Sequence, residues 1–304
     1  VWTTTPWTLP ANAGIAVNPE EFYTAVRWNE KTIWVAEDRA AQTALLNTFI
    51  TQSHDDKQLV VACDIPQHSV PIYTDNSLDT MQIGSTAMID VQKCVQSTLH
   101  GKNFRNVRNR FTTNGFTAEL LSPPHSPALL HDLRMLSDAW LTLPGRQERT
   151  FLLGYFDEDY LQDCQIFAVR NAAGTIEAFA NIVPVYRQEI DQTIDLMRHA
   201  PDAANQIMDY LFMELIEYFD SNGQKKFDLG LAPFSHIDHP HNIPEHAVRI
   251  LHALHAPWFD YAGLEQFKNK FNPDWQPVYF AWSGNLLDFP RIEQALNQLI
   301  TYKS

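Results

Sequence analysis

The sequence predicts a mixed α/β (α+β) protein, and three stretches support this prediction. Residues 193–235 read as strand, loop, helix, turn and strand, the pattern of a β-α-β unit that joins two strands of one sheet. Residues 166–185 hold two apolar runs on either side of the sequence NAAG, which is typical of a β-hairpin. Residues 128–141 repeat apolar side chains at helical spacing, which predicts a helix that packs on a sheet.

The β-α-β unit can be justified residue by residue. A short β-rich run at 193–198 precedes a polar loop, and Asn205 is a suitable helix N-cap. From Gln206 the apolar side chains recur every three or four residues, as on the buried side of a helix. Gly223 follows as a candidate for the left-handed position that ends a helix. Residues 226–231 then resume a strand.

The remaining elements follow from the same periodicities. Strands are expected at 32–36, 59–62, 116–121, 166–170, 176–185 and 278–282, and helices at 38–49, 101–114, 128–141, 244–255, 261–271 and 290–302. The polar stretch 51–57 between them is the expected junction between two parts of the chain.

Composition excludes some classes of protein. The 304 residues carry a net charge of −14, which argues against a chain that coats nucleic acid over its whole surface. The three cysteines, Cys63, Cys94 and Cys164, are odd in number and far apart, so reduced thiols are expected rather than a disulfide framework. No apolar run approaches the roughly 18 residues of a spanning helix, and no signal peptide is recognisable.

Several motifs occur in a characteristic order: IGSTAMIDV at 83–91, GKNFRNVRNRF at 101–111, EAFANIVP at 177–184, DLMR followed by the helix at 195–223, and YAGLEQFKNKFNPDWQPVYF at 261–280. Over about residues 64–282 the chain resembles the soluble domain of bacterial phosphatidylglycerol lysyltransferases, the multiple-peptide-resistance family. That resemblance implies two tandem GNAT-like acyltransferase folds. A meander followed by a β-α-β crossover is the GNAT order, and here it is complete from residue 116 onward.

The resemblance also implies an activity and candidate site residues. Proteins of this family move an amino acid from aminoacyl-tRNA to a lipid headgroup. Asp195 and Arg198 match the DLMR motif, whose acidic and basic residues are implicated in activity. The other substrate-binding candidates are Asp209 and Glu214, for the aminoacyl ammonium group, and Lys268 and Lys270, for the acceptor end or a phosphate. Helix carboxylates and lysines of this kind are, on residue type alone, more often solvated.

Asp195 and Arg198 pose a geometric problem. On a regular strand they point to opposite faces of the sheet. They share one site only if a bulge intervenes or if Arg198 lies in the following loop. The alternative interpretation is a structural pair that fixes that loop.

Two further predictions concern ligands. GNAT enzymes hold the pyrophosphate of coenzyme A at a glycine-rich turn before the central helix. This chain has HAPDAANQ there, without glycine, so acetyl-CoA is not expected and no cofactor is predicted. A tRNA partner needs a local basic patch, and the best candidate is Lys102, Arg105 and Arg108 with Arg110 nearby. The alternative is a solvated basic helix face.

Histidines cluster at 236–255, where six of the twelve occur. Imidazole is a common zinc ligand, which makes a metal site the alternative interpretation. The resemblance implies no metal, and we predict none.

The first eight residues resemble a different family. VWTTTPWT resembles the threonine-rich editing segment of isoleucyl-tRNA synthetases, with Thr3, Thr4, Thr5, Trp7 and Thr8 at the matching positions. A plain edge strand and turn explains the same residues. The predicted domains are therefore an editing-like fragment at 1–50, a truncated first GNAT repeat at 51–98, and a GNAT-like aminoacyltransferase domain at 99–304.

The leading hypothesis is transfer of a lysyl or alanyl group from aminoacyl-tRNA to the hydroxyl of phosphatidylglycerol, at the cytoplasmic face of the cell membrane. The alternative is an inactive truncated or chimeric remnant that at most binds tRNA or a membrane. A deacylating synthetase fragment is the third hypothesis.

Overall fold

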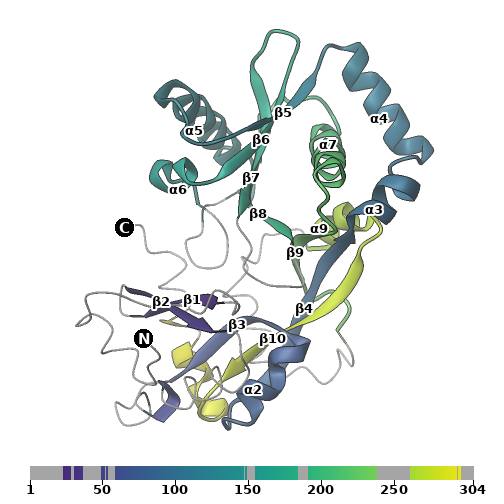
Figure 1. Ribbon diagram of the computed structural model, residues 1–304. Coiled ribbons are helices and arrows are strands. Elements are labelled where there is room, and N and C mark those ends of the chain that lie inside the picture. Colours follow the sequence, from purple (N-terminus) through teal and green to yellow (C-terminus); the bar gives the residue numbers. More distant parts are fainter. Residues whose placement is uncertain are drawn as a thin grey trace.

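A computed structural model describes residues 23–28, 31–36, 49–51, 53, 59–146, 148, 155–183, 191–237, 261–292 and 294–295. An eight-stranded sheet organises them in the order β3-β10-β4-β9-β8-β7-β6-β5 (Figure 1). Its strands are β3 (Val61–Pro66), β4 (Asp79–Asp90), β5 (Thr117–Leu121), β6 (Gln165–Arg170), β7 (Ile176–Val183), β8 (Gln192–His199), β9 (Lys226–Pro233) and β10 (Asp274–Trp282). Among these eight described strands, only β8 and β9 are parallel neighbours.

The predicted β-α-β unit is confirmed as β8, α7 (Ile207–Ser221) and β9. Nine of the fifteen residues of α7 are buried, on several sides of the helix, as expected of a helix enclosed by other elements. Gly223 lies at φ +75°, and the amide of Gln224 donates to the carbonyl of Phe219 at 3.0 Å. This left-handed glycine ends α7 as the sequence predicts.

Helices cover both faces of the part of the sheet formed by β5, β6, β7 and β8, which we call the upper sheet (Figure 1). One face carries α5 (Pro127–Leu141) and α6 (Glu158–Gln162), and the other carries α4 (Lys102–Thr113) and α7. The alternation of β6 explains both cores, because Ile166 and Ala168 belong to the apolar cluster of α5, whereas Phe167 and Val169 belong to that of α7.

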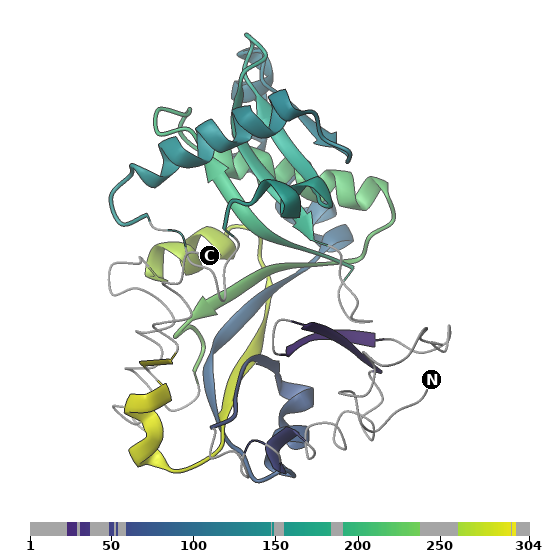
Figure 2. The same ribbon diagram turned by 90° about the vertical axis from the view of Figure 1, so that its left-hand side faces the viewer.

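The long strands β4 and β10 extend the sheet into the lower part of the molecule (Figure 2). β4 pairs with β10 along its length and with β9. Strands that precede and follow residue 98 in the sequence therefore share one sheet. The domain boundaries at residues 50 and 98 stay a prediction. The lower part also holds α2 (Val70–Thr74), and the short helices η2 (Gln67–Ser69) and η5 (Leu286–Asp288). Three more helices lie within the described residues. α3 (Val91–Lys93) and η3 (Cys94–Thr98) follow β4 in the sequence, and α9 (Tyr261–Asn269) precedes β10.

Three predictions need correction. The N-cap of α7 is Gln206, at φ +67° and without a side-chain cap, rather than Asn205, because the side chain of Gln206 instead bonds Asp209 inside the first turn. The strand expected at 59–62 begins at Val61 and runs to Pro66. The strand expected at 278–282 begins four residues earlier, at Asp274, because residues 274–277 already pair with β4.

Other predicted elements fall on residues that are only partly described. β1 (Tyr23–Trp28) and β2 (Lys31–Ala36) form an antiparallel hairpin, which confirms the strand expected at 32–36. The threonine-rich segment at 3–8, the helix at 244–255, and most of the helices at 38–49 and 290–302 lie outside the described residues.

Candidate functional site

The parallel strands β8 and β9 separate soon after they begin. Their paired residues are Gln192 with Phe227 and Thr193 with Asp228. Beyond these two pairs β8 continues beside β7 only, and β9 beside β4. The two parallel strands therefore diverge just before the part of β8 that carries the DLMR motif.

A β-bulge on β8 resolves the geometric problem of Asp195 and Arg198. Ala180 pairs with Met197 and Ile182 with Ile194, so Asn181 of β7 faces two residues of β8 instead of one. Ile194 and Met197 pack toward α7, and Leu196 packs toward α5.

The bulge places both charged side chains on the face covered by α5 and α6. The Tyr160 hydroxyl of α6 donates to Asp195 Oδ2 at 2.9 Å, and Arg198 Nε donates to Ser137 Oγ of α5 at 3.3 Å. The bulge alternative of the prediction is thus the one the chain adopts.

Asp195 belongs to a partly buried hydrogen-bond network. The amide nitrogen of Asn181 donates to the Tyr160 hydroxyl at 3.1 Å and contacts Cys164 Sγ at 3.7 Å. Tyr160 is itself placed by the Asp157 side chain, which caps α6 by accepting from the Tyr160 backbone N–H at 2.9 Å. Burial, and then the Asp195 carboxylate, raise the pKa of Tyr160, so its hydroxyl stays protonated and donates.

Arg198 is a buried cation with an aromatic surface beneath it. The residue is 7% exposed, and its Cζ lies 4.0 Å from the centroid of the Trp140 ring. Nη1 donates to the carbonyl of Met197 at 3.0 Å, and Nη2 lies 4.0 Å from Glu148 Oε1. Burial lowers the pKa of Arg198 to about 10, while the Glu148 carboxylate opposes that shift. The guanidinium therefore keeps its charge at neutral pH.

Lys268 lies on the β9 side of the separation. Its ammonium donates to the carbonyls of Gly230 and Leu231 at 2.7 and 2.8 Å, and the residue is 3% exposed. Burial lowers its pKa to about 7, and Asp228 opposes the shift. The predicted substrate contact of Lys268 stays a prediction, and in the structure its described contacts hold the backbone of β9.

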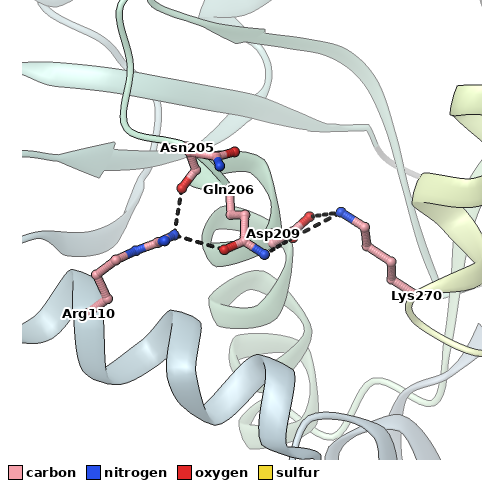
Figure 3. Close-up of polar contacts among 5 residues, drawn as sticks. All are labelled: Arg110, Asn205, Gln206, Asp209 and Lys270. Atoms are coloured by element: carbon pink, nitrogen blue, oxygen red, sulfur yellow. Dashed lines mark hydrogen bonds and ion pairs between the residues drawn. The ribbon is translucent and has the colours of Figure 1, made fainter.

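Asp209 and Lys270 meet at the start of α7 (Figure 3). Lys270 Nζ binds both carboxylate oxygens of Asp209, at 2.8 and 2.9 Å. Gln206 also donates to Asp209, and Arg110 reaches the same turn through Gln206 and the carbonyl of Asn205. A cavity of about 360 Å³ beside this cluster is bordered by Lys102 and other residues of α4. These two substrate-binding candidates therefore already bind each other.

Glu214 lies elsewhere on α7, next to Glu217 and Arg108. Burial, followed by the charge of Glu217, raises the pKa of Glu214. Arg108 is bound to Glu217, whereas Lys102 and Arg105 are exposed. The predicted tRNA-binding patch is thus exposed at two of its three positions, and its function stays a prediction.

The described part of the chain shows neither a metal-binding cluster nor a helix that could span a membrane. No group of three or more metal-ligating side chains lies close enough there to hold an ion. Of the six clustered histidines only His236 is described, 3.3 Å from Glu265 and stacked on Trp275. Among the described helices, each is too short or too polar to span a bilayer.

Comparison with known proteins identifies the family. The sequence model of the family described as "Phosphatidylglycerol lysyltransferase, C-terminal" matches residues 35–282. The chain belongs to this family.

Relatives of the phosphatidylglycerol lysyltransferase C-terminal family agree with the fold. The phosphatidylglycerol lysyltransferase of Bacillus subtilis is 31% identical over 243 residues, which is 79% of this chain but 28% of that protein. The structure of L-PGS from Bacillus licheniformis superposes with a TM-score of 0.76 at 28% identity, covering 91% of this chain and 85% of that one. A C-terminal domain (DUF2156) from Agrobacterium fabrum gives a TM-score of 0.73 at 25% identity, covering 92% and 86%. The predicted family and fold class are confirmed.

Sequence reasoning missed several residues around the DLMR motif. Tyr160, Asn181 and Glu148 contact the motif from three separate segments. One signal was available for Asn181, which is a polar residue within the apolar run AFANIV. Tyr160 and Glu148 carry no comparable signal, because only the tertiary packing of α6 and of Glu148 brings them to β8.

Proposed function

We propose that this chain carries the transfer of an aminoacyl group from aminoacyl-tRNA to a hydroxyl of phosphatidylglycerol, at the membrane surface on the cytoplasmic side. Its membership of the lysyltransferase family supports this proposal. The single structural observation behind it is that Asp195 and Arg198 share one face of β8 where that strand has left β9. Its relatives' names favour lysine over alanine as the transferred residue.

The proposed reaction is a direct exchange of esters. The lipid hydroxyl oxygen attacks the carbonyl carbon of the aminoacyl ester, and a new ester bond forms to the lipid. The bond to the tRNA ribose oxygen breaks, and the proton of the lipid hydroxyl ends on that ribose oxygen. The exchange needs no oxidant and no covalent enzyme intermediate, since one ester replaces another.

The two DLMR residues suit the two charges of this reaction. A carboxylate such as Asp195 can accept the hydroxyl proton and return it to the leaving oxygen. A buried guanidinium such as Arg198 stabilises the negative charge that develops on the carbonyl oxygen, and burial strengthens this interaction. Exposed Lys102 and Arg105 on α4 would contact tRNA phosphates.

The test is a transfer assay with the purified chain, charged lysyl- or alanyl-tRNA and vesicles that contain phosphatidylglycerol. We expect aminoacyl-phosphatidylglycerol to form, and a loss of at least about 100-fold in rate for Asp195→Asn, because the base is removed. Asp132→Asn, an exposed carboxylate on α5, is the matched control and should retain the rate. Tight binding of tRNA without product, for either charged tRNA, would instead support an inactive binding module.

A further inference from the structure

The side chain of Asn181 makes hydrogen bonds to the neighbouring strand β8 and to the Tyr160 hydroxyl. It is fully buried, and its carboxamide oxygen accepts two backbone N–H groups of β8, from Leu196 at 2.7 Å and from Asp195 at 3.3 Å. Its amide nitrogen donates to the Tyr160 hydroxyl at 3.1 Å. One side chain therefore contacts both the backbone of Asp195 and the residue that binds the Asp195 carboxylate.

The position of Asn181 explains why these contacts matter. A bulge leaves one residue of the longer strand without a ladder partner, and a buried N–H group without a partner is unfavourable. Here the extra residue lies opposite Asn181, between the pairs Ala180–Met197 and Ile182–Ile194. The carboxamide oxygen replaces the missing ladder acceptor, so it stabilises the bulge. An apolar residue at 181 would favour a regular strand, on which Asp195 and Arg198 face opposite sides.

We propose that Asn181 is a positioning residue for the reaction, which holds the β8 bulge and thereby puts the Asp195 carboxylate and the Arg198 guanidinium on one face. The inference has two parts. The backbone part, that Asn181 holds the bulge, is independent of any activity. The catalytic part, that this placement sets the rate, rests on the proposed function.

The backbone part is tested by hydrogen exchange on the full chain. Asn181→Leu keeps the branched shape and the number of side-chain heavy atoms but removes both the acceptor and the donor. We expect the amides of the segment 192–199 to exchange at least about tenfold faster than in the unsubstituted chain, with little change in 226–233. The matched control is Asn76→Leu, since Asn76 is also buried and also bonds a backbone carbonyl, that of Ile72 at 2.7 Å. Unchanged exchange at 192–199 in Asn181→Leu overturns the proposal.

The catalytic part is tested by transfer kinetics on the same variants. We expect kcat of Asn181→Leu to fall on the order of 100-fold, as small displacements of reacting groups do, while KM for charged tRNA is unchanged. Asn76→Leu should keep its kcat at a temperature where both variants are folded. Equal kcat for the two variants overturns the catalytic part.

A third variant covers poor folding of Asn181→Leu. Tyr160→Phe keeps the ring and leaves the Asn181 oxygen on both amides, but removes the hydroxyl that binds Asp195. Because that hydroxyl also fixes the Asp195 carboxylate, we expect normal exchange at 192–199 with kcat reduced about tenfold. A kcat equal to that of the unsubstituted chain would show that the placement of this carboxylate does not set the rate, and it overturns the catalytic part. If the unsubstituted chain forms no aminoacyl lipid at all, the proposed function and the catalytic part fail together, and exchange still decides the backbone part.

Discussion

The two faces of the upper sheet hold their charged residues in different ways. On the face of α4 and α7, the Asp209 carboxylate is closed on both oxygens by Lys270 at 2.8 and 2.9 Å. On the face of α5 and α6, the ion pair of Arg198 with Glu148 is long, at 4.0 Å, and an aromatic ring lies beneath the guanidinium. A charge with a close, complete partner stabilises the fold, whereas a buried charge without one retains a field that a reacting group can use.

The largest effect on the transfer rate is expected from a substitution at Arg198. Arg198→Met removes the cation but keeps most of the apolar contact with Trp140. We expect the transfer rate to fall by roughly 100- to 1,000-fold, because a charge that stabilises the transition state is lost. The measurement is kcat in the transfer assay, with folding checked by circular dichroism.

Arg134→Met provides the control for that change. Arg134 also lies over an aromatic ring, Phe156 at 4.6 Å, and pairs with Glu158 at 2.7 Å. It differs in being at the surface, so its loss should leave kcat within about twofold, since exposed pairs contribute little. Equal losses in the two variants would show that Arg198 acts only through packing.

On the face of α4 and α7, a substitution should change the stability of the fold rather than the transfer rate. Lys270→Met leaves the Asp209 carboxylate, whose side chain is 6% exposed, without its cation. We expect the free energy of unfolding to fall by about 2 kcal/mol, less than for a fully buried pair because Lys270 is half exposed. Urea unfolding measures this change, and kcat at a temperature below unfolding should remain as before.

The control for Lys270 is Lys226→Met. Lys226 and Lys270 are equally exposed, at 44%, but the partner of Lys226 is Asp90, whose side chain is 49% exposed. We expect a loss below about 0.5 kcal/mol. A loss as large as that of Lys270→Met would contradict the argument that carboxylate burial decides the effect.

The last prediction concerns Lys268 and the pH dependence of stability. Burial lowers its pKa to about 7, below the value of about 10.4 in an unfolded chain. Between these values the unfolded chain binds more protons, so the free energy of unfolding rises with pH, by on the order of 1 kcal/mol per pH unit. Below about pH 7 both states are protonated, and the contribution is constant.

Lys268→Met should remove that rise when urea unfolding is compared at pH 6.5 and 9.5. Lys225→Met, at an exposed position, should keep it. If Lys268→Met shows the same pH dependence as the unsubstituted chain, the Lys268 amine is not the group that titrates.

The sequence by itself determined the elements that local patterns encode. The helical spacing of α7, the left-handed Gly223 and the strand on either side were predictable because each depends on neighbours within a few residues. The ordered motifs also identified the family. These signals are local or additive along the chain, so they survive without knowledge of the packing.

Only the tertiary structure decided which charged residues act together. Asp195 and Arg198 share a face because Asn181, fourteen residues before Asp195, supplies the acceptor that holds the bulge. Lys268 and Lys270 are two positions apart, yet one binds the carbonyls of β9 and the other binds Asp209. Such partners come from distant segments, and their distances are set by how helices and strands pack rather than by any spacing in the sequence.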